Sequence, residues 1–231
     1  MELKELTKKY KGRKLSESEL SSYEQWSLQF FHQKEFVQEP MLQMTLQLDI
    51  TEAYARYQAR SKEIPEASFS AYLIWHNIQA QKNHPYFRYR KIEDEWYIFD
   101  NLPIFFPVAV GGEARFSEVV IDNPAEDTLE MFFASYRRHV EASKNRKEFK
   151  ALPPLVWANL HFIGNLPNLQ FTGLQIHTPA EKCGRPYFYF GKRYKSEGRM
   201  KIPMLIAFDH SNLDPFVISA FMEEFEHRIK C

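Results

Sequence analysis

Glycine, cysteine and net charge are all scarce in this chain of 231 residues, and each scarcity excludes a class of protein. Only eight glycines occur, and none falls in a G-x-G-x-x-G or G-x-x-x-x-G-K pattern, so neither a Rossmann site nor a P-loop is expected. The two cysteines, Cys183 and Cys231, form neither a disulfide framework nor a metal-spaced pair, which is typical of the reducing cytoplasm. Lys plus Arg and Asp plus Glu both number 30, so no net charge attracts nucleic acid.

Signatures of metal sites, serine hydrolases and membrane segments are missing as well. The eight histidines include no H-x-x-x-H pair, and the nearest metal-like grouping, His177 with Cys183, has no partner motif. No G-x-S-x-G elbow occurs, and the basic run KNRKEFK is most simply the solvated end of a helix. The N-terminus lacks the apolar region of a signal peptide, and no run approaches the roughly 18–20 apolar residues that span a bilayer. We therefore expect a cytoplasmic protein without metal, membrane or nucleic-acid partners.

The chain does contain ample material for a core, because 44% of its residues are hydrophobic and 16% are aromatic. A basic lead-in at 1–15 precedes a single domain at 16–231, which opens with the spacing of a capping box, Ser16 with Glu19. Strand-like runs are predicted at 41–50, 87–100 (two strands around a turn), 102–112, 115–122, 155–164, 169–177, 185–194 and 202–210; helices are predicted at 51–64, 66–82, 126–145 and after 214. This order predicts one α/β domain with a large mixed sheet and helices mainly on one side.

The stretch FDHSNLDPF, residues 208–216, contains the strongest candidate for chemistry. Asp214 followed by Pro215 is a good helix start, so a purely structural role explains Asp214 as well as a catalytic one does. His210 ends an apolar strand just before a turn, a place where side chains face clefts at a sheet edge. Histidine is also the residue best suited to accept a proton near neutral pH, so His210 is a candidate general base.

This stretch resembles the signature of chloramphenicol acetyltransferases, Gln-aliphatic-His-His-(Ser/Ala)-x-x-Asp-Gly-(Phe/Tyr)-His. The second histidine falls on His210, the small residue on Ser211, the aspartate on Asp214 and the aromatic residue on Phe216. The resemblance continues along the chain, in the family's order, through LDITEAY, NHPYFRYRKIEDEWYIFD, IGNLPNLQFTGLQ, RPYFYFGKRY and IPMLIAFDH.

The resemblance implies a two-layer α/β sandwich with a large mixed β-sheet covered by helices, the fold of CoA-dependent acyltransferases. It implies a homotrimer whose active sites lie between subunits and receive acetyl-CoA and a small-molecule alcohol. In such enzymes the signature histidine, here His210, takes the proton of the acceptor hydroxyl, and the oxygen attacks the thioester directly. Asp214 is the signature aspartate of that site.

Four positions depart from the family pattern. Asp209 replaces the first histidine of the signature, and we expect its side chain to point to the opposite face from His210 because strand side chains alternate. Pro215 replaces the glycine. Glu24 stands where the family places an arginine that pairs with the aspartate. Gly164 stands where the family has the serine that stabilises the tetrahedral oxyanion, and Asn165 or a backbone N–H is the expected substitute.

The resemblance also implies two binding regions. The acceptor pocket involves Phe30, Phe31 and Tyr189, the last at a position where the family carries a small hydroxyl residue; each aromatic ring has core packing as its alternative role. The CoA channel runs past Lys192, Arg193 and Tyr194, whose alternative is a solvated hairpin. These residues leave two main hypotheses: an O-acetyltransferase, with antibiotic resistance as its role if chloramphenicol is the acceptor, or a catalytically impaired member acting as a ligand-binding trimer. A weaker third is an interaction protein using an aromatic surface.

Overall fold

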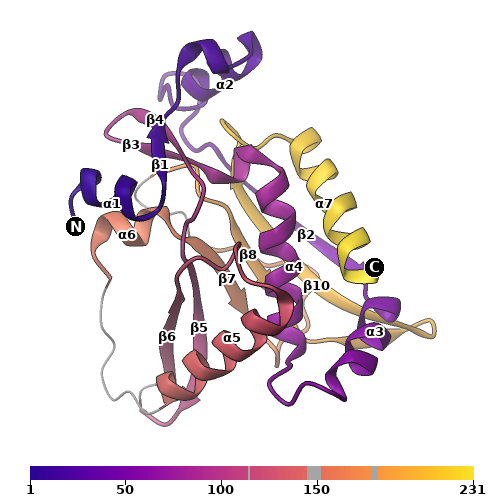
Figure 1. Cartoon of the computed structure of the whole chain (residues 1–231). Helices are drawn as coiled ribbons and strands as arrows, with labels where there is room; N and C mark the ends of the chain where they lie inside the picture. The colour runs from indigo at the N-terminus through magenta and orange to yellow at the C-terminus, as the bar shows by residue number, and fades with distance from the viewer. Residues whose placement is uncertain (114, 145–151, 178–181) are drawn as a thin grey trace.

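A computed structural model of the chain describes residues 1–113, 115–144, 152–177 and 182–231. Its main feature is a large mixed sheet (Figure 1), in the order β2 (Met41–Asp49), β10 (Arg199–Asp209), β8 (Tyr187–Phe190), β7 (His161–Asn165), β5 (Ile104–Gly111) and β6 (Arg115–Ile121), with β9 (Tyr194–Ser196) paired to β10. The pairs β5–β7 and β7–β8 are parallel and the others are antiparallel. The predicted mixed sheet is therefore confirmed.

Four helices cover one face of this sheet (Figure 1): α3 (Thr51–Ser61), α4 (Phe69–Asn83), α5 (Leu129–Lys144) and α7 (Pro215–Lys230). Alternating strand residues such as Ile163, Phe188 and Ile206 join the helices in the main core. Their neighbours Phe162, Tyr187 and Ala207 form a separate cluster on the opposite face. The result is a two-layer sandwich, as expected.

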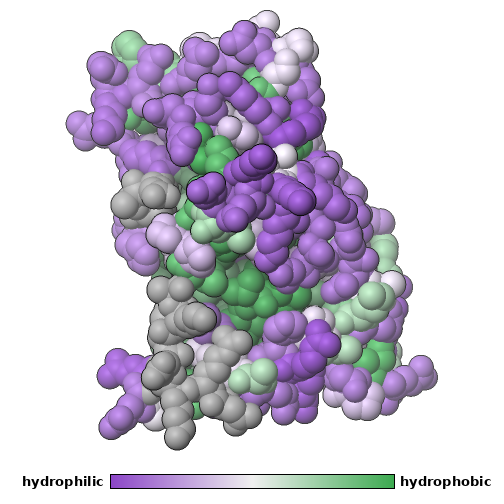
Figure 2. All heavy atoms as spheres, turned by 60° about the vertical axis from the view of Figure 1, so that its left-hand side comes forward, coloured by the Kyte–Doolittle hydropathy of each residue, from purple (hydrophilic) through white to green (hydrophobic). Residues whose placement is uncertain are grey.

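The face without these helices is partly covered by chain that was predicted to be strand. The run 155–164 was predicted as one strand, but it begins as helix α6 (Pro154–Asn159), since prolines at 153 and 154 favour a helix start. Residues 169–177 contain no strand. They run beside β2 as coil and are held there by side-chain hydrogen bonds, such as the one that Gln43 Nε2 donates to the Ile176 carbonyl. Seen from the side of α6 and β6, the surface is apolar in its middle and polar above and below (Figure 2).

The segment 1–15, expected to be a basic lead-in, is folded against the rest of the chain. It forms α1 (Leu3–Lys9) and β1 (Gly12–Lys14), and β1 joins β4 (Glu95–Phe99) and β3 (Tyr89–Ile92) in a second, three-stranded sheet. The side chains of Leu6 and Tyr10 are buried with Phe99. Because the segment is rich in lysine, its small apolar face was not predicted from the sequence.

The residues that follow lead directly to the candidate site. The capping box of Ser16 and Glu19 closes only the 3-10 turn η1 (Glu17–Glu19), whereas α2 (Ser22–Phe30) has its own capping box of Ser21 and Glu24. A second 3-10 turn, η2 (Pro85–Arg88), joins α4 to β3. Within the described ranges, no helix is long and apolar enough to span a membrane. Residues 145–150 of the basic run KNRKEFK lie outside the described residues.

Candidate active site

His210 lies in the turn that follows the longest strand, β10, and packing rather than hydrogen bonding holds its ring. Its backbone N–H donates to the Pro40 carbonyl at 2.9 Å. Its imidazole stacks on the ring of Phe31, the C-cap residue of α2, with centroids 4.2 Å apart and planes at 22°. Neither ring nitrogen has a hydrogen-bond partner in the described part of the chain, and Nδ1 is buried. The ring is therefore oriented by Phe31, and Nε2 is the nitrogen left available to accept a proton.

A cavity of about 90 Å³ lies beside His210, between α2 and the start of α7. Both acidic residues on its wall take part in helix capping. Glu24, the third residue of α2, accepts from the N–H of the N-cap Ser21 at 2.8 Å, and Asp214, the N-cap of α7, accepts from the N–H groups of Phe216 and Val217. The cap role predicted for Asp214 is thus confirmed. The lining residues are Ser21, Tyr23, Glu24, Ser27, Leu28, Tyr86, Tyr89, His210, Ser211, Asn212, Asp214 and Val217.

Tyrosines, not an arginine, surround these two carboxylates. Burial raises the pKa of Tyr23, and the charge of Asp214 and a side-chain hydrogen bond to it raise that pKa further. Burial and then the Glu24 charge raise the pKa of Tyr89 to about 12. No ion pair to Asp214 is present within the described residues, so its polar neighbour is the Tyr23 phenol, which the sequence reading did not identify. The cavity is acidic and its phenols are protonated at neutral pH.

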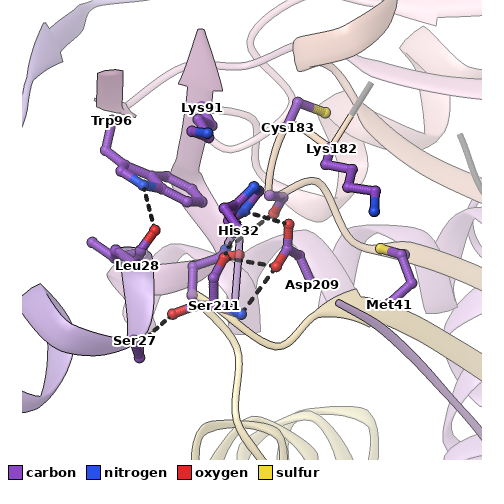
Figure 3. A network of polar contacts seen from close by, with 12 residues as sticks. Ser27, Leu28, His32, Met41, Lys91, Trp96, Lys182, Cys183, Asp209 and Ser211 are labelled. Carbon is purple, nitrogen blue, oxygen red and sulfur yellow. Dashed lines mark hydrogen bonds and ion pairs between the residues drawn. The ribbon is translucent and has the colours of Figure 1, made fainter. Parts of the chain in front are cut away.

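A buried polar cluster that the sequence reading missed fixes the chain on both sides of His210 (Figure 3). Asp209, only 1% exposed, accepts from the hydroxyl of Ser211 at 2.6 Å and from its N–H at 3.0 Å. The Nε2 atom of His32 lies 3.2 Å from Oδ2 of Asp209 and 3.2 Å from Oγ of Ser211. Ser27 on α2 donates its hydroxyl hydrogen to the Ser211 carbonyl at 2.5 Å. The cluster ties α2 and its following loop to the turn that presents His210.

Although this cluster contains a serine, a histidine and an aspartate, it lacks the geometry of a hydrolytic triad. In a triad the acid and the serine contact different ring nitrogens of the histidine, whereas here both contact Nε2 of His32. Ser211 is also buried. Burial alone would raise the pKa of Asp209, but the contacts with His32 and Ser211 outweigh it and lower that pKa. The only signal of this cluster in the sequence is Asp209 itself, because an aspartate at the end of an apolar strand needs a polar partner.

Gly164 and Tyr189 are neighbours in the parallel pairing of β7 with β8. A Cβ atom built on Gly164 would lie 2.3 Å from both Cδ1 and Cε1 of Tyr189, so the tyrosine ring occupies the space of a side chain at 164. Asn165 points to the other face, where its Nδ2 donates to the Ser70 hydroxyl on α4 at 2.8 Å. The two residues expected to share the oxyanion role therefore lie on opposite faces of the sheet.

The residues expected in the acceptor pocket do not all come together within one chain. Phe31 contacts His210, and Phe30 stacks on Trp26 at 4.8 Å in the same aromatic group. Tyr189 is paired with Leu205 on β10, and His210 lies five residues beyond Leu205 (205 to 210). At ~3.3 Å per residue, Tyr189 and His210 are separated by about 16 Å along the strand direction.

Of the three residues expected near CoA, only two line the same cavity. Lys192 and Arg193 line a cavity of about 240 Å³ between α4 and the ends of β7 and β8, which Asn165 also lines. The Arg193 guanidinium lies over the rings of Tyr54 and Phe69, 4.7 and 4.9 Å from their centroids. Tyr194 does not line this cavity; its hydroxyl donates to Gln47 at 2.8 Å. Among the described residues, no group of three or more His, Cys, Asp or Glu side chains could hold a metal ion.

The fold of the chain is shared with solved acetyltransferase structures. Solved structures confirm the fold: one described as a chloramphenicol acetyltransferase superposes with a TM-score of 0.79 at 20% identity, covering 95% of this chain and 100% of that one. A dihydrolipoamide acetyltransferase of Azotobacter vinelandii gives a TM-score of 0.66 at 18% identity, covering 83% of this chain and 82% of its own. A probable dihydrolipoamide acetyltransferase from Listeria monocytogenes gives 0.63 at 16%, covering 90% and 88%.

The sequence itself decides the family. Residues 19–226 match the family model described as chloramphenicol acetyltransferase, so the chain belongs to the chloramphenicol acetyltransferase family. No curated protein shows a significant match to the chain. Family and fold together support an acetyltransferase-like function.

Proposed function

We propose that the protein is a CoA-dependent O-acetyltransferase that transfers an acetyl group from acetyl-CoA to a hydroxyl of a small molecule. Membership of the chloramphenicol acetyltransferase family supports this proposal. The observation that carries it is the environment of His210: a ring fixed by Phe31 beside a cavity, with no hydrogen bond to either nitrogen from the residues that the structure describes. A histidine held in this way is suited to remove a proton from an acceptor hydroxyl.

In the proposed reaction, His210 takes the hydroxyl proton as the acceptor oxygen forms a bond with the thioester carbon. The electron pair of the carbonyl moves onto its oxygen, which gives a tetrahedral oxyanion. When the carbonyl re-forms, the C–S bond breaks, and the departing thiolate takes the proton from His210. A positioned base contributes about 10²–10⁴-fold to such a reaction.

The separation of the site residues favours active sites between subunits. His210 and the Gly164–Tyr189 pair are about 16 Å apart along the strand direction in one chain, whereas groups that stabilise one tetrahedral centre must lie within ~3 Å of it. A second copy that packs against the helix-free face would bring its own His210 to that pair. The apolar cluster on this face, with Phe105, Phe162 and Tyr187, suits such a contact. We infer the homotrimer that the family resemblance implies.

The two substrates would approach from different elements. Lys192 and Arg193 present cationic groups in one cavity, and cations suit the phosphates of acetyl-CoA. Phe30 and Phe31 present aromatic rings next to His210, which suits an uncharged or aromatic acceptor alcohol.

The test is release of the CoA thiol from acetyl-CoA, measured with chloramphenicol and a panel of small alcohols. We expect turnover by the wild type and a loss of about 10²–10⁴-fold in kcat for His210→Ala. The matched control is His227→Ala, which removes an exposed histidine on α7. Native mass spectrometry reports the trimer. Equal rates for wild type and His210→Ala would contradict the proposal.

A second candidate, a catalytically impaired member that binds ligand as a trimer, is favoured by one specific observation. The position of the expected oxyanion serine is Gly164, and Tyr189 covers it. For this candidate, CoA would raise the thermal midpoint of the wild type, yet no alcohol would release thiol from acetyl-CoA.

A further inference from the structure

The pairing of Gly164 with Tyr189 links two departures that look independent in the sequence. At Gly164 the ring of Tyr189 fills the space that a side chain would take, with two ring carbons 2.3 Å from the place of a Cβ. A side chain at 164 and the observed Tyr189 ring therefore exclude each other. The space of a side chain on β7 is thus filled by a side chain from β8.

The ring that fills this space carries a hydroxyl group. The phenol oxygen of Tyr189 is two bonds beyond Cε1, one of the atoms that overlap with a Cβ at 164. Its hydroxyl makes no hydrogen bond within the described residues, and it is not a buried unpartnered atom, so it is open to a ligand. Burial, and then the neighbouring Tyr187, raise the pKa of Tyr189, which keeps the phenol protonated as a donor at neutral pH.

The other donor expected at this place is already engaged. The amide of Asn165 donates to Ser70 on the helix-covered face, opposite to the face of Tyr189. Phe162 packs beside the Tyr189 ring at 5.4 Å, so the phenol projects from an apolar wall. A hydrogen-bond donor in apolar surroundings stabilises a negatively charged oxygen more strongly than the same donor in water.

We propose that Tyr189 is a catalytic residue whose hydroxyl donates the hydrogen bond that stabilises the tetrahedral oxyanion, in place of a side chain at 164. This inference rests on the proposed function. The proton stays on Tyr189 throughout; the oxyanion only accepts its hydrogen bond while the partner subunit's His210 holds the acceptor proton. In this assignment Tyr189 contacts the acyl group that is transferred, whereas the sequence predicted that it contacts the acceptor.

The first test is Tyr189→Phe, which removes the hydroxyl and keeps the ring over Gly164. We expect kcat for acetyl-CoA with an acceptor from the wild-type panel to fall by about 10²–10³-fold, the loss typical of one oxyanion donor. The KM for acetyl-CoA, the thermal midpoint and the native mass should stay unchanged. If Tyr189 had only a structural role, the thermal midpoint or the native mass would change instead. Tyr57→Phe, which removes a hydroxyl on the helix side, is the matched control.

The second test exchanges the two positions. Tyr189→Ser alone removes both ring and phenol, and kcat should fall at least as far as in Tyr189→Phe. Adding Gly164→Ser in the space left by the ring should recover roughly tenfold or more in kcat, a non-additive effect expected of residues in contact. A folded Tyr189→Ser variant as fast as the wild type would overturn the assignment.

The controls separate this inference from the function on which it rests. If the wild type is active, His210→Ala is inactive and Tyr189→Phe is as fast as the wild type, only the inference is overturned. If the wild type binds CoA but transfers acetyl to no alcohol in the panel, the proposed function fails and the inference fails with it.

Discussion

The imidazole of His210 and the ring of Phe31 form a stacked pair with centroids 4.2 Å apart and planes at 22°. Phe31 ends α2, and the following loop is tied to the turn after β10 by His32. Since no hydrogen bond from the described part of the chain holds either nitrogen of His210, this stack is the main constraint on the orientation of its ring. Orientation of the base matters because proton transfer requires the acceptor hydroxyl within hydrogen-bond reach.

Phe31→Leu should lower kcat by about 3–10-fold and leave the KM for acetyl-CoA unchanged. The reason is that an aromatic pair is worth ~0.5–1.5 kcal/mol beyond its buried area, and that energy now restricts the imidazole. Steady-state kinetics with the best acceptor of the panel measure the effect. The same substitution at Phe36, which is 67% exposed and does not stack on the imidazole, is the control. A kcat for Phe31→Leu equal to that of the control would show that other contacts orient His210.

His32→Ala should destabilise the fold by ~1–3 kcal/mol at pH 7, because it leaves the buried Oδ2 atom of Asp209 without its contact to the imidazole of His32. Urea unfolding at pH 7 measures this loss. The matched variant Asp209→Asn removes the charge and keeps an acceptor for Ser211, so it should cost less. An equal loss in both variants would contradict this account.

The same aspartate predicts a pH dependence. Contacts with His32 and Ser211 lower the pKa of Asp209 in the folded protein, so the stabilisation is present above the unfolded pKa of ~3.9. It is lost as the pH falls through the lower, folded value. The difference in unfolding free energy between wild type and Asp209→Asn should therefore shrink on acidification below about pH 4. A difference that stays constant down to pH 2 would exclude this linkage.

Asp214→Ala should cost ~0.5–2 kcal/mol, because the carboxylate accepts from two N–H groups at the start of α7. Asp214→Asn should retain most of that stability, since its amide oxygen can make the same contacts. Chemical denaturation of the two variants gives the comparison. A large loss in Asp214→Asn would mean that the charge beside Tyr23, rather than the cap, stabilises this turn.

Regular local patterns allowed much of the fold to be predicted from the sequence. The Asp214-Pro215 cap and the charged turn between β3 and β4 depend on neighbouring residues, and both are present in the structure. The run 155–164 was misread because its apolar residues serve equally in the short helix α6 and in β7. Short apolar runs do not distinguish the two kinds of element.

Contacts between distant residues account for what the sequence did not reveal at the site. His32 meets Ser211 across 179 residues, so nothing near Asp209 in the sequence identifies its partner. The exclusion between Gly164 and Tyr189 depends on the register of β7 with β8, and one residue of slip would place Tyr189 on the other face. Family resemblance predicted which positions matter, but only the register shows that two of them share one space.

Arg193→Ala should raise the KM for acetyl-CoA by about 10–100-fold and leave kcat unchanged, the pattern of a lost ground-state contact. The Arg193 guanidinium lies over the rings of Tyr54 and Phe69 and lines the cavity that Lys192 also lines. Within the described residues it has no carboxylate partner, so its charge is available for a phosphate. Lys195→Ala, which removes an exposed cation on β9 outside this cavity, is the control. Since salt screens charged contacts, the KM difference between wild type and Arg193→Ala should narrow at high ionic strength. An equal rise in KM for both variants would mean that overall charge, not Arg193, attracts the CoA phosphates.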